Sequence, residues 1–431
     1  MPSASCSHCR AARVARPRIG SVSRRGWLWI AFVVVHVIVA VLGFVLPNIP
    51  MGDVYLVYEP WARDAIEGRG IAGISYEWIY PQLAIVPMVL ALGLEWIAGY
   101  EIAWALVVTL ADALAFAMLV GRGRSNGRTI AAGFWLVFML LLGPVGMYRL
   151  DGVTVPLALA GCLWLAGRPL VASILLAVAT WMKVWPAALL AAAVIALRRR
   201  LVVVGGALIV TAMTAVAVVA GGGGAHLLGF VAGQTGRGLQ LEAPVSAIYL
   251  WQAVAGVPGA FVYYDRDILT FQVTGFAVDA VIAAMTPVLA VAVLGVAALG
   301  VFLAWRGARF ATLFPPLALS LVLAFIVFNK VGSPQFLTWL IAPVAIGLVL
   351  DRRRWLLPAA VALVAALLTQ LVYPVFYDRI IVADAFGATI LTLRNLVMLA
   401  LFAWAAVRLA RVPRGTRLRP SARRTQHPII P

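Results

Sequence analysis

Apolar runs of close to twenty residues recur along the sequence, separated by short polar or arginine-rich connections. About 20 apolar residues in an α-helix are needed to cross the hydrocarbon core of a bilayer. The chain is 64% hydrophobic and only 12% charged, whereas soluble domains are about 25% charged. Lipid offers the backbone no hydrogen bonds, and the runs lack strand-type alternation, so the spans must be helices. We therefore predict an all-α, polytopic integral membrane protein.

The segment 80–97 decides the topology. If it packs at the outer face without crossing, both termini are inside, and 25 of the 34 lysines and arginines lie inside and nine outside. If it crosses, every later segment inverts and the split becomes 13 inside and 21 outside. Basic residues near helix ends concentrate on the cytoplasmic side, which favours the first arrangement. That arrangement has about 12 spans, at 27–46, 101–120, 129–148, 153–167, 170–182, 184–197, 201–220, 279–303, 309–328, 335–350, 356–374 and 388–410. We expect the short segments within 153–197 to be half-helices that line a cavity.

The chain divides into one membrane domain, 27–410, and two basic tails, 1–26 and 411–431, which we expect in the cytoplasm. The first apolar run is long enough to span and has no small-residue cleavage site, so it is a signal anchor. Two long external loops, expected to be helical, cover 47–100 and 221–278. The net charge of +18 therefore orients the protein in the membrane and does not indicate nucleic-acid binding. This pattern predicts a multi-pass protein of the plasma membrane.

Cysteine and histidine spacing indicates neither a metal site nor a disulfide framework. Cys6 and Cys9 form a single Cys-x-x-Cys in the basic tail, and no second ligand pair for zinc is nearby. Cys162 is alone in an apolar run, and no ligand spacing joins His36 to His226. We therefore propose no metal and no cofactor.

Only two of the 34 basic residues are lysines, Lys183 and Lys330, and each lies in an otherwise apolar stretch. A charge in such a place is costly unless it has a partner or a water-filled cavity. Both fall at the outer face in the favoured topology, where a lysine can bind phosphate as a point charge. The alternative is snorkelling to the lipid headgroups. Arg237, flanked by glycines in an external loop, adds a third cation.

Three carboxylates are candidates for chemistry. Asp53 follows the first span by seven residues and could be a general base for a substrate hydroxyl, or else a loop acid or helix cap. Asp151 lies at another outer turn, where a cap or a pairing with Arg149 is the structural alternative. Asp112 lies within a span, where an acid is a functional candidate, or is neutral and hydrogen-bonded in the bundle.

Four stretches of the sequence resemble motifs of one enzyme family. They are Gly52-Asp53-Val54-Tyr55 with Tyr80-Pro81-Gln82-Leu83-Ala84, then Lys183-Val184-Trp185-Pro186, then Arg237-Gly238-Leu239-Gln240-Leu241-Glu242-Ala243-Pro244, and Lys330-Val331-Gly332-Ser333-Pro334-Gln335-Phe336-Leu337-Thr338-Trp339-Leu340. They are similar to motifs of glycosyltransferase family 87, also called DUF2029, in the GT-C superfamily of polyprenyl-phosphate-sugar-dependent enzymes. The likeness covers about residues 27–350. Gln82 stands where the family usually has a second proline, and Ala243 where it has serine.

The resemblance implies an inverting transfer of a hexose, with mannose favoured, from a polyprenyl-phosphate sugar to a hydroxyl of a glycolipid or glycan. The reaction would take place on the extracytoplasmic face, in a GT-C-like fold, with membrane lipid around it. In the family a mobile first external loop carries the catalytic acid, which maps onto Asp53. The substrate-binding candidates are Lys183, Lys330, Arg237, Asp151, Tyr80 and Gln335.

Two alternatives remain open. One is a transporter or flippase of a lipid-linked or anionic solute, for which Asp112 is the supporting feature. The other is a membrane protein without catalytic activity. The glycosyltransferase hypothesis predicts that Asp53, Lys183 and Lys330 approach one outer-facing cavity, close enough for one sugar phosphate to bridge them. The topology predicts that 80–97 does not complete a crossing.

Overall fold

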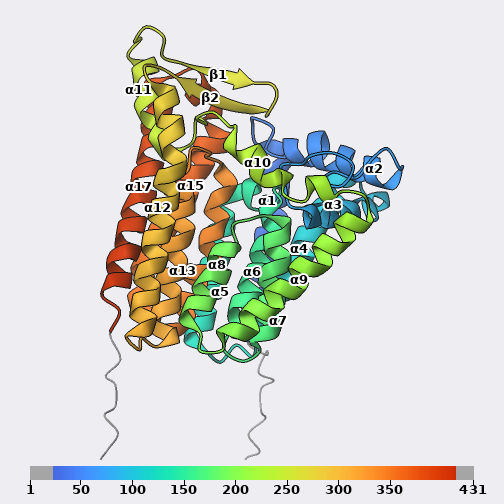
Figure 1. Cartoon of the computed structure of the whole chain (residues 1–431), viewed down its shortest axis with the longest axis vertical. Helices are drawn as coiled ribbons and strands as arrows, with labels where there is room; N and C mark the ends of the chain where they lie inside the picture. Colours follow the sequence, from blue (N-terminus) through green and yellow to red (C-terminus); the bar gives the residue numbers. More distant parts are fainter. Residues whose placement is uncertain (1–22, 414–431) are drawn as a thin grey trace, which may run out of the picture.

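Long apolar helices run side by side through the molecule, as Figure 1 shows for a computed structural model that describes residues 23–413. Within these residues, eight helices are long and apolar enough to cross a membrane. They are α1 (Arg24–Val45), α4 (Tyr100–Val120), α5 (Asn126–Leu142), α9 (Arg200–Ala220), α12 (Val278–Trp305), α13 (Phe310–Val327), α15 (Arg352–Gln370) and α17 (Ala385–Ala410). The mostly helical, membrane-type fold agrees with the prediction. The two predicted tails lie largely outside the described residues, as do Cys6 and Cys9.

The predicted number of about 12 spans is not supported. Four of the predicted spans are helices of only 10–14 residues: α6 (Asp151–Trp164), α7 (Pro169–Met182), α8 (Ala187–Ala196) and α14 (Ile341–Leu350). A helix of that length rises at most about 21 Å, less than the ~30 Å of a hydrocarbon core. Composition alone suggested spans because the segments are as apolar as the long helices. The shortness of α6, α7 and α8 agrees with the half-helices expected within 153–197, whereas α14 was expected to be a full span.

The segment 80–97 folds as a short helix, α3 (Ile85–Leu92), between two 3-10 turns. Eight residues rise only about 12 Å, so α3 is too short to cross a bilayer. It packs between α2 (Glu59–Ile66) and α4, and the Tyr100 hydroxyl donates to the Met88 carbonyl over 3.0 Å. The structure therefore agrees with the prediction that this segment does not complete a crossing.

The arginine-rich connections gather at one end of the bundle, the lower end in Figure 1. There Arg24 donates to the Asn126 side chain over 2.8 Å, and Arg408 lies 3.8 Å from the Asp351 carboxylate. Residues of three other connections, within 165–169, 196–199 and 307–310, line one shared hollow. The connections that were predicted to lie inside thus share one end, and the segments 47–100 and 221–278 cover the other.

The second external segment contains a β-hairpin at the top of Figure 1, so the prediction of wholly helical external loops is wrong there. β1 (Phe261–Asp265) pairs antiparallel with β2 (Thr270–Thr274), and helices α10 (Gly229–Thr235) and α11 (Ala247–Val254) precede them. Two backbone hydrogen bonds of 3.0 Å, Leu241 N–H to Phe271 and Val273 N–H to Leu239, join the extended segment 239–241 to β2. The hairpin escaped prediction because each strand is only five residues long.

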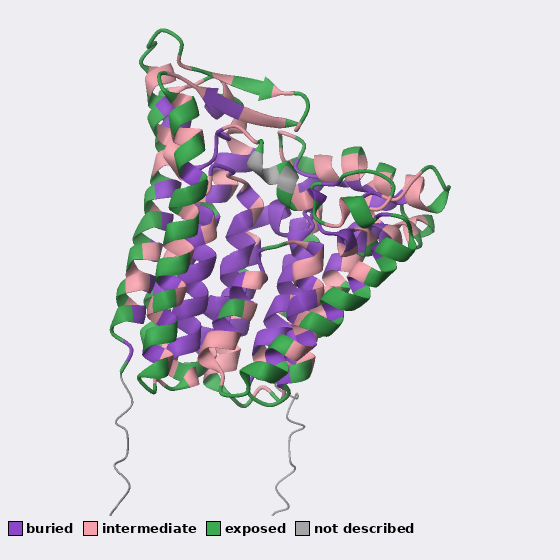
Figure 2. Cartoon of the chain, in the orientation of Figure 1, coloured by how far each residue is buried: buried purple, intermediate pink, exposed green. Residues whose placement is uncertain are grey.

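Burial separates the helices into a core and a rim (Figure 2). Helices α13 and α14 are buried along most of their length. Helices α9 and α12 instead expose large apolar side chains, such as Leu201, Val216, Val291 and Leu294. Apolar exposure on this scale is not found on a soluble monomer, and lipid is the environment that accommodates it.

Candidate functional site

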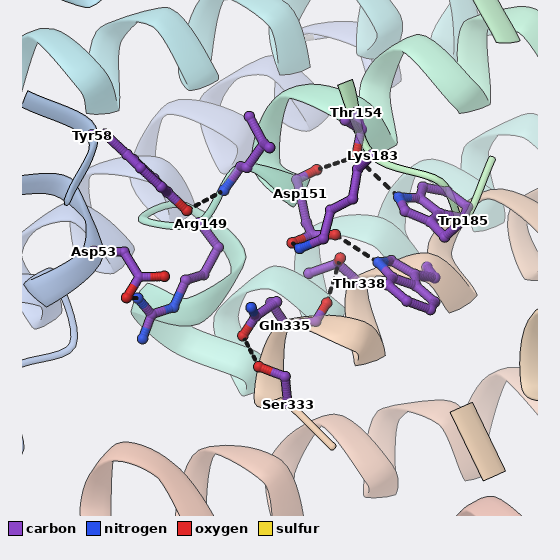
Figure 3. Close-up of polar contacts among 12 residues, drawn as sticks. Asp53, Tyr58, Arg149, Asp151, Thr154, Lys183, Trp185, Ser333, Gln335 and Thr338 are labelled. Carbon is purple, nitrogen blue, oxygen red and sulfur yellow. Dashed lines mark hydrogen bonds and ion pairs between the residues drawn. The ribbon is translucent and has the colours of Figure 1, made fainter. Parts of the chain in front are cut away.

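Two ion pairs lie close together at the end of the bundle that carries the external segments (Figure 3). In the first, the Asp53 carboxylate contacts the Arg149 guanidinium. The Asp53 side chain is 35% exposed and that of Arg149 only 8%. Asp53 therefore presents an accessible carboxylate whose charge is balanced from the protein interior.

Local structure fixes this acid. Asp53 directly precedes a π-helical turn, Val54–Tyr58, which continues into α2, and both Met51 and Val54 beside it are buried. The Tyr58 hydroxyl accepts a hydrogen bond of 3.1 Å from the Leu150 backbone N–H. The loop that carries Asp53 is thereby attached to the turn that carries Arg149.

In the second pair, the Lys183 ammonium lies 2.5 Å from the Asp151 carboxylate. Asp151 begins α6 and is completely buried, and its other oxygen accepts from the Trp339 indole N–H over 2.6 Å. An acid in the first turn of a helix is also favoured by the helix dipole. The suggested pairing of Asp151 with Arg149 is wrong, because Arg149 contacts Asp53 and Lys183 takes Asp151.

Aromatic rings enclose the Lys183 side chain. Its ammonium lies 5.7 Å from the ring centre of Tyr80 and 5.8 Å from that of Phe336. Trp185 stacks on Trp339 with ring centres 5.5 Å apart and planes 8° apart. The Trp185 indole also donates to the Thr154 hydroxyl over 3.0 Å, which attaches the Lys183 motif to α6.

Tyr80 lies beside both ion pairs. Its hydroxyl is hydrogen-bonded to Tyr58, and burial, followed by the charges of Asp53 and Asp151, raises its pKa. The structure therefore brings Asp53, Asp151, Lys183 and Tyr80 together from four separate parts of the chain. Arg237 follows α10, and burial lowers its pKa, but no contact joins it to these four side chains among the residues that the structure describes.

The other two candidates lie on the segment that leads into α14. The Ser333 hydroxyl contacts the Gln335 side-chain carbonyl, and the Thr338 hydroxyl donates to the Gln335 backbone over 2.7 Å. Lys330 is buried, burial lowers its pKa, and its backbone carbonyl accepts from the Gln240 N–H over 3.0 Å. Contact of the Lys330 ammonium with the same phosphate as Lys183 stays a prediction.

Sequence reasoning missed the role of Arg149 and a third buried ion pair. Arg394 of α17 lies 3.4 Å from the Glu242 carboxylate, and both side chains are buried. Tyr377 also donates to Glu242, and burial raises the pKa of this carboxyl to about 7. Arg394 had a recognisable signal, since it is a lone arginine inside an apolar run.

Asp112 is hydrogen-bonded within the bundle, as the structural alternative to a functional role predicted. Its carboxyl lies 3.1 Å from His36 Nε2, and both side chains are buried. The His36 Nδ1 is 2.9 Å from the Phe32 carbonyl, so Nδ1 carries a proton. A proton must then lie between Nε2 and the carboxyl, and the pair is neutral overall whichever group holds it.

Within residues 23–413, no three His, Cys, Asp or Glu side chains are grouped so that they could hold a metal ion. Comparison of the sequence with protein-family models gives no match, and comparison with curated proteins gives none either. The site itself places the partly exposed Asp53 carboxylate beside Arg149 and near the Asp151–Lys183 pair. Such a site suits proton removal from a hydroxyl next to an anionic group.

Proposed function

We propose that this protein is a membrane glycosyltransferase that moves a hexose, with mannose favoured, from a polyprenyl-phosphate sugar to a hydroxyl of a glycolipid or glycan. The observation that carries the proposal is the accessible Asp53 carboxylate held by Arg149 beside the Asp151–Lys183 pair. Asp151 begins α6 and Lys183 directly follows α7, and the connection that contains Arg168 joins the opposite ends of these two helices. By the positive-inside rule, the end with Asp151 and Lys183 faces away from the cytoplasm.

The proposed reaction begins with removal of a proton from the acceptor hydroxyl by the Asp53 carboxylate. The acceptor oxygen then attacks the anomeric carbon from the face opposite the phosphate. The bond between that carbon and the phosphate oxygen breaks, the electron pair stays on the phosphate, and the configuration of the sugar is inverted. General base catalysis of this kind contributes about 10²–10⁴-fold to a rate.

The cations of the site would stabilise the charge that develops on the leaving phosphate. Asp53 and Asp151 each offset one basic partner, so the two ion pairs carry no net charge. Lys330 and Arg237 are the further cations that the proposal assigns to the phosphate. Burial disfavours the charged form of both, as their lowered pKa values indicate, and a bound phosphate would offset that cost. Lys183 has three donors and gives one to Asp151, which leaves two for a substrate oxygen.

The transporter hypothesis depended on Asp112. Because its carboxyl is buried and paired with His36, it is accounted for as a link between α1 and α4. We therefore propose the enzyme.

The test is Asp53→Asn in membrane vesicles supplied with a radiolabelled polyprenyl-phosphate hexose and a glycolipid acceptor. We expect product formation to fall by at least about 100-fold, because the amide cannot accept the proton. The matched control is Asp64→Asn, which removes another acid of the same external segment, one that pairs with Arg69 at the surface. Product formation at the normal rate in Asp53→Asn would refute the catalytic role, and solute uptake without product would favour a transporter.

A further inference from the structure

The loop that carries Asp53 is hydrogen-bonded to a tyrosine from a distant part of the chain. Tyr373 lies in the π-helical turn that follows α15, and its side chain is buried. Its hydroxyl lies 3.0 Å from the Asn48 carbonyl and 3.1 Å from the Ile49 carbonyl, just before Asp53 in the sequence. The Asn48 side chain in turn donates to the Pro374 carbonyl over 2.7 Å. These contacts attach the loop 47–53 to the end of α15.

Arg149 decides in which direction the Tyr373 hydroxyl donates. A guanidinium can only donate hydrogen bonds, and one nitrogen of Arg149 lies 3.3 Å from the hydroxyl oxygen. The oxygen therefore accepts from Arg149, and its single proton is directed to the two loop carbonyls. The same guanidinium contacts the Asp53 carboxylate. Asp53 is thus held at its side chain by Arg149 and through its loop by Tyr373.

The backbone of this loop is strained. Asn48 and Ile49 have φ angles of 61° and 52°, in the left-handed region. Asparagine tolerates this conformation, but a β-branched residue such as isoleucine rarely adopts it. The Ile49 side chain is 58% exposed, so side-chain packing does little to hold it there. A strained backbone persists only where its surroundings hold it, and here the hydrogen bonds with Tyr373 and Pro374 do so.

The strained residue is connected directly to the turn that presents Asp53. The Ile49 carbonyl accepts from the Gly52 N–H over 2.9 Å as well as from Tyr373. The Met51 carbonyl accepts from the Val54 N–H over 2.8 Å. Because these bonds enclose Asp53, a change in the backbone angles of Ile49 would displace the Asp53 carboxylate.

We propose that Tyr373 is a positioning residue, which holds the strained loop 47–53 so that the Asp53 carboxylate stays beside Arg149 and within reach of the acceptor hydroxyl. The inference rests on the proposed function. Without the Tyr373 hydroxyl the loop would relax to ordinary backbone angles, and the base would be out of reach for most of the time. Tyr373 touches no reacting atom in this scheme. The alternative is that Tyr373 only fills the core and gives Arg149 an acceptor.

The first experiment compares Tyr373→Phe with the wild type in the vesicle transfer assay. The cost of a left-handed residue corresponds to about fivefold to thirtyfold in population, and kcat should fall by that factor. KM for the acceptor should stay close to the wild-type value, because Tyr373 does not touch the substrate. Tyr100→Phe is the matched control, since it removes another tyrosine hydroxyl that donates to a backbone carbonyl, that of Met88. A wild-type kcat in folded Tyr373→Phe would overturn the proposal.

A second substitution separates positioning from core stability. Glycine adopts a positive φ without steric cost, so Ile49→Gly alone should change kcat little. In the Tyr373→Phe background, Ile49→Gly should restore most of the lost kcat, because the loop no longer needs the hydroxyl to reach the active conformation. A defect of the core could not be repaired from an exposed loop position. Equal losses in Tyr373→Phe and in the double variant would overturn the positioning role.

The third measurement is hydrogen–deuterium exchange of the purified full-length protein in detergent. The Gly52 and Val54 N–H groups should exchange about fivefold to thirtyfold faster in Tyr373→Phe and at the wild-type rate in Tyr100→Phe. Unchanged exchange in Tyr373→Phe would overturn the inference whatever the transfer assay gives. Since exchange needs no sugar donor, failure of the inference is distinguished from failure of the proposed function, which an absence of transfer in the wild type would show.

Discussion

The pairing of Lys183 with Asp151 allows a separation of structural and chemical roles. Lys183→Met would leave the Asp151 carboxylate completely buried, with the Trp339 indole, 2.6 Å away, as its remaining donor. Breaking a buried ion pair from one side costs about 3–5 kcal/mol of stability. Asp151→Asn should cost a similar amount, because the Lys183 side chain is only 12% exposed. The double variant carries no buried charge here and should lie close to the wild type.

Asp151→Asn in the double variant also keeps an oxygen that can accept from Trp339, so the aromatic enclosure around position 183 is preserved. The assay is thermal unfolding of the purified protein in detergent, together with transfer from a polyprenyl-phosphate hexose. We expect both single variants to lose Tm and the double variant to regain it. If Lys183 also contacts the phosphate, transfer should stay low in the double variant although its fold is restored.

The stability and the activity of the double variant test the pairing and the substrate contact separately. A double variant as unstable as the worse single variant would show that the two side chains do not stabilise each other. A stable double variant that transfers hexose at the wild-type rate would remove Lys183 from substrate binding. Arg63→Met is a control. It disrupts ion pairs with Glu59 and Glu95, but the Arg63 side chain is 39% exposed, so the loss should be only about 1 kcal/mol.

Two further predictions concern the backbone and the topology. Gly332→Ala should destabilise the protein and lower transfer, because an added methyl would overlap the backbone of Glu242 and Ala243. The control Gly236→Ala should change little, because its methyl would meet open space. An unchanged Tm in Gly332→Ala would contradict the close approach of the two segments. The topology can be tested with single cysteines in a chain whose Cys6 and Cys9 are replaced by serine. Arg266→Cys in the hairpin should react with a membrane-impermeant thiol reagent in intact cells, and Arg124→Cys should not. The reverse pattern would invert the topology.

The helices could be predicted because they follow from local composition. Each predicted span coincides with a helix, since an apolar run in lipid has no other way to satisfy its backbone. The number of membrane-crossing helices could not be predicted in the same way. The run at 184–197 is as apolar as the longer ones, but it forms a helix over only Ala187–Ala196. The hairpin was missed because strand pairing depends on contacts between two segments, and strands of five residues carry little signal in the sequence.

The positions where a buried charge would be costly can be recognised in the sequence alone. Lysines in apolar stretches are costly wherever they lie, so Lys183 and Lys330 were conspicuous without any structure. The pairing of charges was decided only by the tertiary structure. Arg149 and Asp151 are two residues apart in sequence, yet Arg149 contacts Asp53 and Asp151 contacts Lys183. Charges buried in a low-dielectric interior pair with whatever opposite charge the packing brings within reach, and packing joins residues that sequence spacing does not.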